Sequence, residues 1–226
     1  MKRFHAAMVF AVVTLSLGCM AAGQGSAGSS QDQPSLNDQL FQAVQKGDAV
    51  AVEKLLGNGA NIDARGQDDL TPLIVAVSSG KIGVVELLLK KGANLELHDD
   101  RGDTALHYAV MVENSDVAKM LLDNGANINA QEQDGLTPLM KSIVSDSVDI
   151  VKLLLDHGAN TEARDKNGFT ALMTASGGGL VDLMKLLLDK GADVNAKSND
   201  GATALKLAVH NGKTDAEKLL RKKGAR

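Results

Sequence analysis

The residues of this chain whose types could carry chemistry are five scattered histidines, one cysteine and short clusters of aspartate. His98, Asp99, Asp100 and Asp103 lie within six residues, and carboxylates this close together can attract a cation. A calcium loop needs ligands at regular short steps around a fixed turn, however, and this stretch lacks that pattern. The sequence also has no Ser/His/Asp arrangement, no phosphate loop after a strand and no Cys/His metal spacing. We therefore expect no catalytic centre, no metal site and no cofactor.

Composition and charge narrow the class of partner. Aromatic residues make up 2% of the 226 residues and apolar residues 44%, which favours small, closely stacked helices rich in Leu, Val and Ala. The net charge is -4, and it becomes -6 without the first thirty residues, with 22 basic against 28 acidic groups. Because binding to phosphate needs a basic face, we expect a partner other than nucleic acid.

The N-terminus has the residue order of an export signal. Lys2 and Arg3 precede an apolar run over residues 6–17, and small residues follow it. The run is shorter than the ~20 residues that a membrane-spanning helix needs. We therefore assign residues 1–22 to a signal peptide and residues 23–35, which are rich in Gly and Ser, to a flexible linker.

Cys19, the only cysteine, stands where the apolar run ends. The segment resembles a bacterial lipoprotein box, in which the cysteine becomes the first residue and carries lipid, although that motif prefers Leu where Ser16 stands here. Cleavage near Ala21 or Ala22 is the alternative, and it would remove Cys19. The protein is thus expected in the periplasm or anchored to a membrane through Cys19, with full secretion as the alternative.

Two markers recur with a period of 33 residues over most of the chain. The first is Gly-Ala, followed by Asn or Asp in all copies but the last, and it begins at Gly59, Gly92, Gly125, Gly158, Gly191 and Gly224. The second is Thr-Pro-Leu or Thr-Ala-Leu, and it begins at Thr71, Thr104, Thr137, Thr170 and Thr203. Two markers that keep one period without insertion or deletion predict a solenoid built from a single repeated unit.

Each unit reads as two short helices. The threonine suits an N-cap, and Pro72 and Pro138 suit the first helical position, where a missing N–H is tolerated. The second helix, such as residues 150–155, is apolar nearly all round, as expected for a helix packed between neighbours, and the glycine of the first marker ends it. We predict an all-α repeat solenoid of about six helix–turn–helix units with β-hairpin-like loops.

On these motifs the chain resembles ankyrin-repeat proteins over about residues 36–226. Only His107 keeps the histidine of the family's Thr-Pro-Leu-His motif, and the resemblance implies that it hydrogen-bonds between turns. Glu113 and Asp146 stand where other units end the first helix with glycine. Units 1 to 6 cover about residues 36–66, 67–99, 100–132, 133–165, 166–198 and 199–226.

The resemblance implies that partners bind on the concave side, formed by the loop tips and the exposed face of each first helix. The apolar residues at these positions are Leu70, Met111, Val112, Leu136, Val144 and Phe169, with Asp103 at the same position as Leu70. The charged residues around them are Asp68, Asp100, Arg101, Asp134 and Lys166. An apolar centre with a charged rim is typical of a protein interface, although the same side chains would also suit packing between units.

The function that fits these features is that of a monomeric adaptor in the bacterial cell envelope, which binds and protects or regulates a partner protein. A secreted effector acting on host proteins is the first alternative. An enzyme with an unrecognised site is the second.

Overall fold

The computed structural model describes residues 34–226. The signal peptide predicted at residues 1–22, the lipidation site at Cys19 and residues 23–33 of the linker lie outside the described residues. None of the helices in the described part of the chain is long and apolar enough to cross a membrane.

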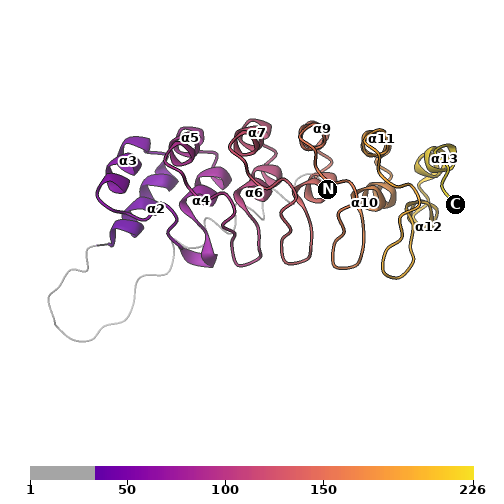
Figure 1. Cartoon of the computed structure of the whole chain (residues 1–226), viewed down its shortest axis with the longest axis horizontal. Helices are drawn as coiled ribbons and strands as arrows, with labels where there is room; N and C mark the ends of the chain where they lie inside the picture. Colours follow the sequence, from indigo (N-terminus) through magenta and orange to yellow (C-terminus); the bar gives the residue numbers. More distant parts are fainter. Residues whose placement is uncertain (1–33) are drawn as a thin grey trace.

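The described chain forms six pairs of antiparallel helices that stand side by side in chain order (Figure 1). The first helices of the pairs, here called the inner helices, are α2 (Leu36–Lys46), α4 (Pro72–Ser78), α6 (Ala105–Met111), α8 (Pro138–Val144), α10 (Ala171–Gly178) and α12 (Ala204–His210). The outer helices are α3 (Ala49–Gly57), α5 (Ile82–Lys90), α7 (Ser115–Asp123), α9 (Val148–Asp156), α11 (Val181–Asp189) and α13 (Thr214–Lys222). The loops between pairs project beyond the row of inner helices, and a short 3-10 helix, η2 (Gln67–Asp69), lies in the loop of unit 2.

The threonine marker starts the inner helices as predicted. The hydroxyl groups of Thr71, Thr137, Thr170 and Thr203 each accept a hydrogen bond from the backbone N–H three residues later, at 3.2–3.4 Å. Each bond satisfies one of the N–H groups that the first turn of a helix leaves without a partner. Thr104 differs, because His107 occupies the third helical position of its unit and contacts the threonine with its ring.

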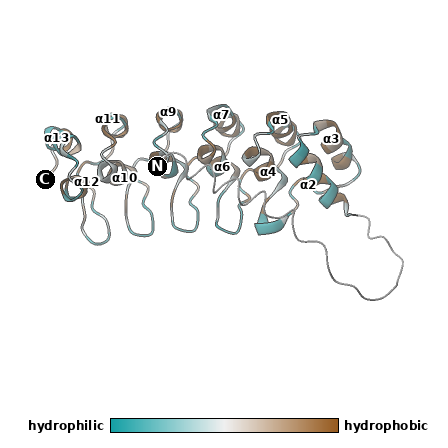
Figure 2. Ribbon diagram, turned by 180° about the vertical axis from the view of Figure 1, so that it is seen from behind, coloured by the Kyte–Doolittle hydropathy of each residue, from teal (hydrophilic) through white to brown (hydrophobic). Residues whose placement is uncertain are grey.

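The core lies between the two rows of helices, where each unit contributes leucine, valine and alanine to a seam that continues into the next unit (Figure 2). One buried cluster covers units 1 to 3 and a second covers units 3 to 6, and the two meet at α6. The inner helices are closely packed at one repeated position that is fully buried and holds Ala76, Ala109, Ser142, Ala175 and Ala208. Small side chains there allow neighbouring helices to approach closely.

The loops repeat one backbone geometry. In the loop between units 2 and 3 the N–H of Asp99 donates to the carbonyl of Asp103 at 3.1 Å, and His98 and Thr104 form an isolated antiparallel bridge. Neighbouring loops are joined by backbone bonds from Asp100 to Asp68, Gln133 to Arg101, Lys166 to Asp134 and Asn199 to Asn167, at 2.8–3.1 Å. These bonds give the predicted hairpin-like form and hold the loop tips in a row.

A second set of contacts between units lies at the base of the loops. In each case a side-chain oxygen accepts the backbone N–H of a residue 31 positions later in the next unit, at 2.8–2.9 Å. The acceptors are Asp63, Glu96, Asn129, Glu162 and Asn195. Each unit is therefore aligned on the one before it by the same side-chain position.

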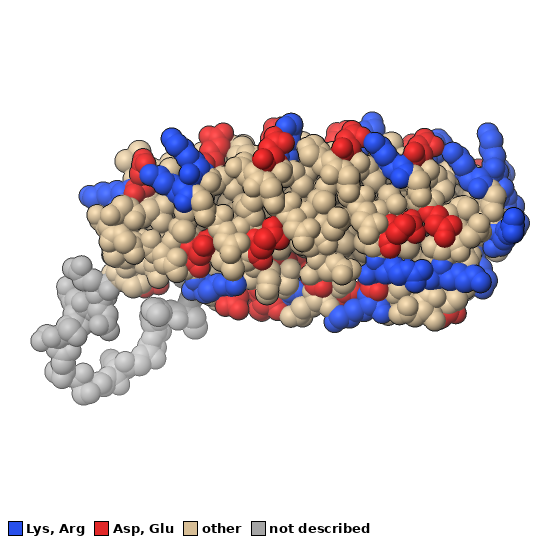
Figure 3. Space-filling model, viewed as in Figure 1, with Lys and Arg blue, Asp and Glu red and all other residues tan. Residues whose placement is uncertain are grey.

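Charged side chains of both signs gather along the edge formed by the outer helices (Figure 3). Ion pairs between units run along this edge, with Asp156 Oδ1 2.8 Å from Lys190 Nζ and Asp189 Oδ1 3.1 Å from Lys223 Nζ. These side chains are between 40% and 67% exposed, so water screens the pairs and each contributes little to stability.

Candidate partner-binding face

The surface that the sequence points to, here called the inner-face site, consists of the loop tips and the exposed side of the inner helices. Leu70, Leu136 and Phe169 each stand directly before the capping threonine, and all three are half-buried and packed against the core clusters. Their side chains therefore serve packing between units and also leave part of their surface open. Packing between units is confirmed for these residues, and their role in binding a partner stays a prediction.

The inner helices of the central units contribute the more exposed apolar groups. Met111 and Val112 are half-buried at the end of α6. Val144, at the end of α8, has 58% of its surface exposed and is one of few large apolar side chains in the described chain that are so open to water. Because a side chain this exposed adds little to the core, its apolar character is free to serve a contact with another molecule.

Asp103 was predicted as a contact residue, and this prediction does not hold, because the residue is only 3% exposed. Its Oδ1 atom lies 2.6 Å from Nζ of Lys141, which reaches back from α8 of the next unit, and the side chain of Lys141 is itself only 15% exposed. Asp103 Oδ1 and Lys141 Nζ therefore form a close ion pair, but the angles between the two groups do not fit a hydrogen bond. The ammonium group of Lys141, in the next unit, thus stabilises the carboxylate of Asp103 in a buried place. Leu70 and Leu136 occupy the equivalent place in their own units.

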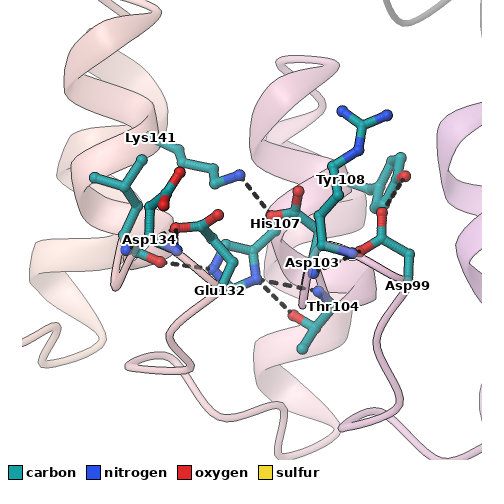
Figure 4. A network of polar contacts seen from close by, with 10 residues as sticks. Asp99, Asp103, Thr104, His107, Tyr108, Glu132, Asp134 and Lys141 are labelled. Atoms are coloured by element: carbon teal, nitrogen blue, oxygen red, sulfur yellow. Dashed lines mark hydrogen bonds and ion pairs between the residues drawn. The ribbon is translucent and has the colours of Figure 1, made fainter. Parts of the chain in front are cut away.

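Asp103 belongs to a buried polar network in unit 3 (Figure 4). Asp99 accepts the hydroxyl of Tyr108 at 2.9 Å and the backbone N–H of Asp103 at 2.7 Å. His107 accepts the backbone N–H of Thr104 on Nδ1 at 3.2 Å. With Nδ1 as the acceptor, Nε2 carries the proton and faces the carbonyl of Leu136 in the next unit at 3.3 Å.

Burial shifts the acid–base behaviour of this network. The pKa of His107 is lowered to about 4, first because the ring is buried and second because the charge of Lys141 lies nearby. Burial raises the pKa of Asp103, and Lys141 opposes that rise. The pKa of Tyr108 is also raised, by burial and then by the negative charge of Asp99. His107 is therefore neutral at neutral pH and acts as a hydrogen-bonded link between units 3 and 4.

The predicted charged rim lies at the loop tips. Asp68, Asp100, Arg101, Asp134 and Lys166 are all exposed there. Lys166 Nζ lies 3.9 Å from Asp134 Oδ1, which links the tips of units 4 and 5. Because neighbouring tips are joined by backbone hydrogen bonds, the backbone positions that carry these charges are fixed relative to one another.

Comparison with known proteins agrees with this architecture. A family model described as "Ankyrin repeats (3 copies)" matches residues 40–132, 124–198 and 163–226. The chain belongs to the ankyrin-repeat family. It is similar to the crystal structure of the ankyrin repeat domain of Bcl-3, described as a unique member of the IkappaB protein family, with 32% identity and a TM-score of 0.78. The likeness covers 83% of this chain and 86% of that one. Among curated protein sequences, none matches the chain.

These findings make the chain a protein–protein interaction module, because ankyrin repeats serve to bind other proteins. They also confirm the all-helical solenoid and the period on which it was predicted.

The ion-pair partner of Asp103 was not predicted from the sequence. Lys141 occupies a repeated position in the inner helices, and its charge makes it an exception there. The other residues at this position are Val75, Tyr108, Thr174 and Leu207. Asp103 and Lys141 each hold a repeated position that is mostly apolar in the other units, and they stand in consecutive units. Two charged residues of opposite sign in such positions could have predicted the ion pair.

Two shallow hollows lie between units 1 and 2. One, of about 430 Å³, is lined by Leu56, Gly57, Ala60, Asn61, Ile62 and Lys91. The other, of about 310 Å³, is lined by Ala49, Val50, Glu53, Gly83, Glu86, Leu87 and Lys90. Asp103, His107 and Tyr108 line neither hollow, and within residues 34–226 no three His, Cys, Asp or Glu side chains are placed to hold a metal ion.

Proposed function

We propose that this ankyrin array is a monomeric adaptor of the bacterial cell envelope that binds a partner protein on the inner-face site. The observation that carries the proposal is Val144, an apolar side chain with 58% of its surface exposed near the centre of the array, at the same repeat position as half-buried Met111 of the preceding unit. The backbone bonds between loop tips support it, because a surface held in place before binding loses little conformational entropy when the partner arrives.

The test of the binding face is a change at Val144. Val144→Asp places a charge in the proposed contact, and because the side chain is exposed, the helices should remain folded. We expect the variant to lose partner capture from envelope extracts, with an unchanged circular dichroism spectrum.

Val50→Asp is the matched control, because Val50 is 81% exposed but lies on the outer helix α3. This variant should capture the partner as the original protein does. Equal capture by the Val144→Asp and Val50→Asp variants would contradict the proposed face.

The envelope location rests on the sequence of the first 35 residues, and a lipid on Cys19 would hold the array at a membrane through the linker. Cell fractionation of the full chain and of Cys19→Ala tests this proposal. We expect the original protein in the membrane fraction and the variant in the soluble periplasmic fraction. Unlipidated protein in the culture medium would instead support the secreted effector.

A further inference from the structure

The exposed apolar residues of units 3 and 4 are bordered on one side by acidic side chains. Glu113 follows Val112 directly, and Asp146 comes two residues after Val144. Asp116 and Asp149 lie in the first turns of the outer helices α7 and α9 that follow. All four side chains are exposed, so this border is formed at the turns between inner and outer helices.

These four carboxylates have no basic partner in the described chain. No Lys, Arg or His nitrogen of residues 34–226 lies within 4.0 Å of them. Units 5 and 6 differ, because the equivalent Asp182 lies 2.9 Å from Lys185 and Asp215 lies 3.3 Å from Lys218. Exposed ion pairs therefore occur at these turns in units 5 and 6 and not at the four central carboxylates, although Lys119 and Lys152 hold the positions of Lys185 and Lys218 in their own helices.

The backbone at this border also favours glycine. Glu113 and Asp146 have φ angles of 54° and 56°, in the left-handed region that disfavours residues with a Cβ atom. Gly80, Gly179 and Gly212 hold the equivalent position in units 2, 5 and 6. The two carboxylates thus occur where glycine would fit the backbone better, in the same two units that expose Met111, Val112 and Val144.

The opposite border of the apolar residues is acidic as well. The loop tips of units 2 to 4 expose Asp68, Asp69, Asp100 and Asp134, with the exposed cation Arg101 among them and Lys166 of unit 5 lying 3.9 Å from Asp134. The apolar centre of the inner-face site therefore lies between two rows of mainly negative charge. In units 5 and 6 the positions equivalent to Met111, Val112 and Val144 hold Gly177, Gly178, His210 and Asn211, and the exposed apolar side chain of α12, Val209, stands one position earlier.

We propose that units 2 to 4 bind a cationic amphipathic segment of the partner protein. Its apolar side chains contact Met111, Val112 and Val144, and its lysines and arginines face the two acidic borders. This inference rests on the proposed function and adds the chemistry of the partner. Complementary charge accelerates association and selects against anionic partners, so the same borders would repel nucleic acid and anionic membrane surfaces.

A synthetic helical peptide tests the inference. The probe is a fluorescent peptide of about 18 residues made of Leu and Lys with one apolar face, compared with the same pattern made of Leu and Glu. We expect the described array to bind the Leu/Lys peptide at least tenfold more tightly, measured by fluorescence anisotropy, and the affinity to fall as salt rises from 0.1 to 1 M, where the screening length drops from about 10 to about 3 Å. Equal affinity for the two peptides would overturn the proposal.

The double variant Glu113→Gly with Asp146→Gly removes two charges and gives the backbone the residue it favours, so it should fold. We expect it to bind the Leu/Lys peptide roughly tenfold more weakly. The matched control, Asp182→Asn with Asp215→Asn, changes the net charge by the same amount in units 5 and 6 and should leave the affinity unchanged. The same loss in both double variants would show a non-specific charge effect and would overturn the proposal.

Capture of the partner from envelope extracts separates this inference from the proposed function. If Val144→Asp abolishes capture and Glu113→Gly with Asp146→Gly leaves it intact, the binding face is correct and the cationic partner is wrong. If neither variant affects capture, the face itself is wrong. Loss of capture in both variants, with Asp182→Asn and Asp215→Asn unaffected, supports both proposals.

Discussion

Units 3 and 4 differ from units 5 and 6 in the chemistry that joins one unit to the next, although the backbone is the same. At the junction of units 3 and 4 the two repeated positions hold the ion pair of Asp103 and Lys141, and at the junction of units 5 and 6 they hold Phe169 and Leu207. The loop-closing bond from Asp99 to Asp103 and its equivalent in unit 5 are both 3.1 Å long. The loop conformation is therefore set by the backbone, and the side chain before the threonine is free to be polar or apolar.

The histidine position shows the same contrast. His107 is fully buried in unit 3 and is hydrogen-bonded at both ring nitrogens, whereas Met140 and Met173 fill the equivalent positions with only van der Waals contact. The ionisable groups of the interior are thus concentrated in unit 3 and at its junction with Lys141 of unit 4, and the histidine position itself is apolar in units 4 and 5. The central junction should depend on charge and pH in ways that the C-terminal junctions do not.

Breaking the ion pair should have the largest effect on this contrast. Lys141→Leu leaves the carboxylate of Asp103 buried without its cation, and we expect a loss of about 3 kcal/mol in the free energy of unfolding. Adding Asp103→Leu makes the junction apolar, as in units 5 and 6, and should restore most of that loss. Urea unfolding followed by circular dichroism measures both variants, and equal stability of the single and double variants would contradict this account.

Lowering the pH should have the second-largest effect, because it destabilises the junction of units 3 and 4 through His107 and not the C-terminal junctions. The pKa of His107 is about 4 in the folded protein and 6.5 in the unfolded chain, so the unfolded chain binds more protons between these values. Stability is therefore complete above pH 6.5 and falls as the pH drops towards 4, by on the order of 2 kcal/mol. The raised pKa of Asp103 has the opposite effect, because it favours the folded protein as the pH falls. The exposed carboxyl of Glu53, whose pKa is lowered by Lys91, changes stability in the same direction as His107, so a histidine variant is needed to assign the loss.

His107→Met, which copies units 4 and 5, is the variant for this measurement. Urea midpoints recorded between pH 7 and 4.5 should decline in the original protein and stay nearly level in the variant. A parallel decline in the two proteins would assign the pH dependence to other groups.

The strained turns should give a smaller, stabilising effect. Glu113→Gly or Asp146→Gly removes the Cβ atom at a positive φ, and we expect each to add about 1 kcal/mol to the free energy of unfolding. Gly212→Ala makes the reverse change in unit 6, where a Cβ atom would have no neighbour within 4 Å, so any loss of stability there comes from the backbone alone. Thermal and urea unfolding measure these changes. Equal stability of all three variants and the original protein would show that the positive φ angles cause no strain.

The ion pairs on the outer edge should matter least. Asp156→Asn removes the pair with Lys190, which joins units 4 and 5, and both side chains are largely exposed. The lowered pKa of Asp156 reflects its hydrogen bond and charge interaction with Lys190, but solvent screens both. We expect no measurable shift of the urea midpoint at 0.15 M salt, and a clear loss would show that the edge contributes to the alignment of units.

Much of this fold could be predicted from the sequence because its signals are local and repeated. The threonine caps, the glycines that end the inner helices and the apolar outer helices each follow from backbone chemistry within one unit. The direction of a side chain at a unit boundary depends on the residue that meets it from the next unit. Asp103 was therefore placed wrongly on the surface, and the half-buried state of Leu136 and Phe169 was left open between packing and binding.

The side-chain acceptors at the base of the loops have a consequence for how such a chain changes over time. Asp63, Glu96 and Asn129 differ in length and charge, yet each meets the same backbone N–H of its neighbour. At this joint a whole period can be duplicated or deleted in the gene without a mismatch, since either new neighbour offers what the old one did, whereas Asp103 still requires Lys141 from the unit that follows it. The array can therefore gain or lose length in steps of one repeat while its existing surfaces keep their shape.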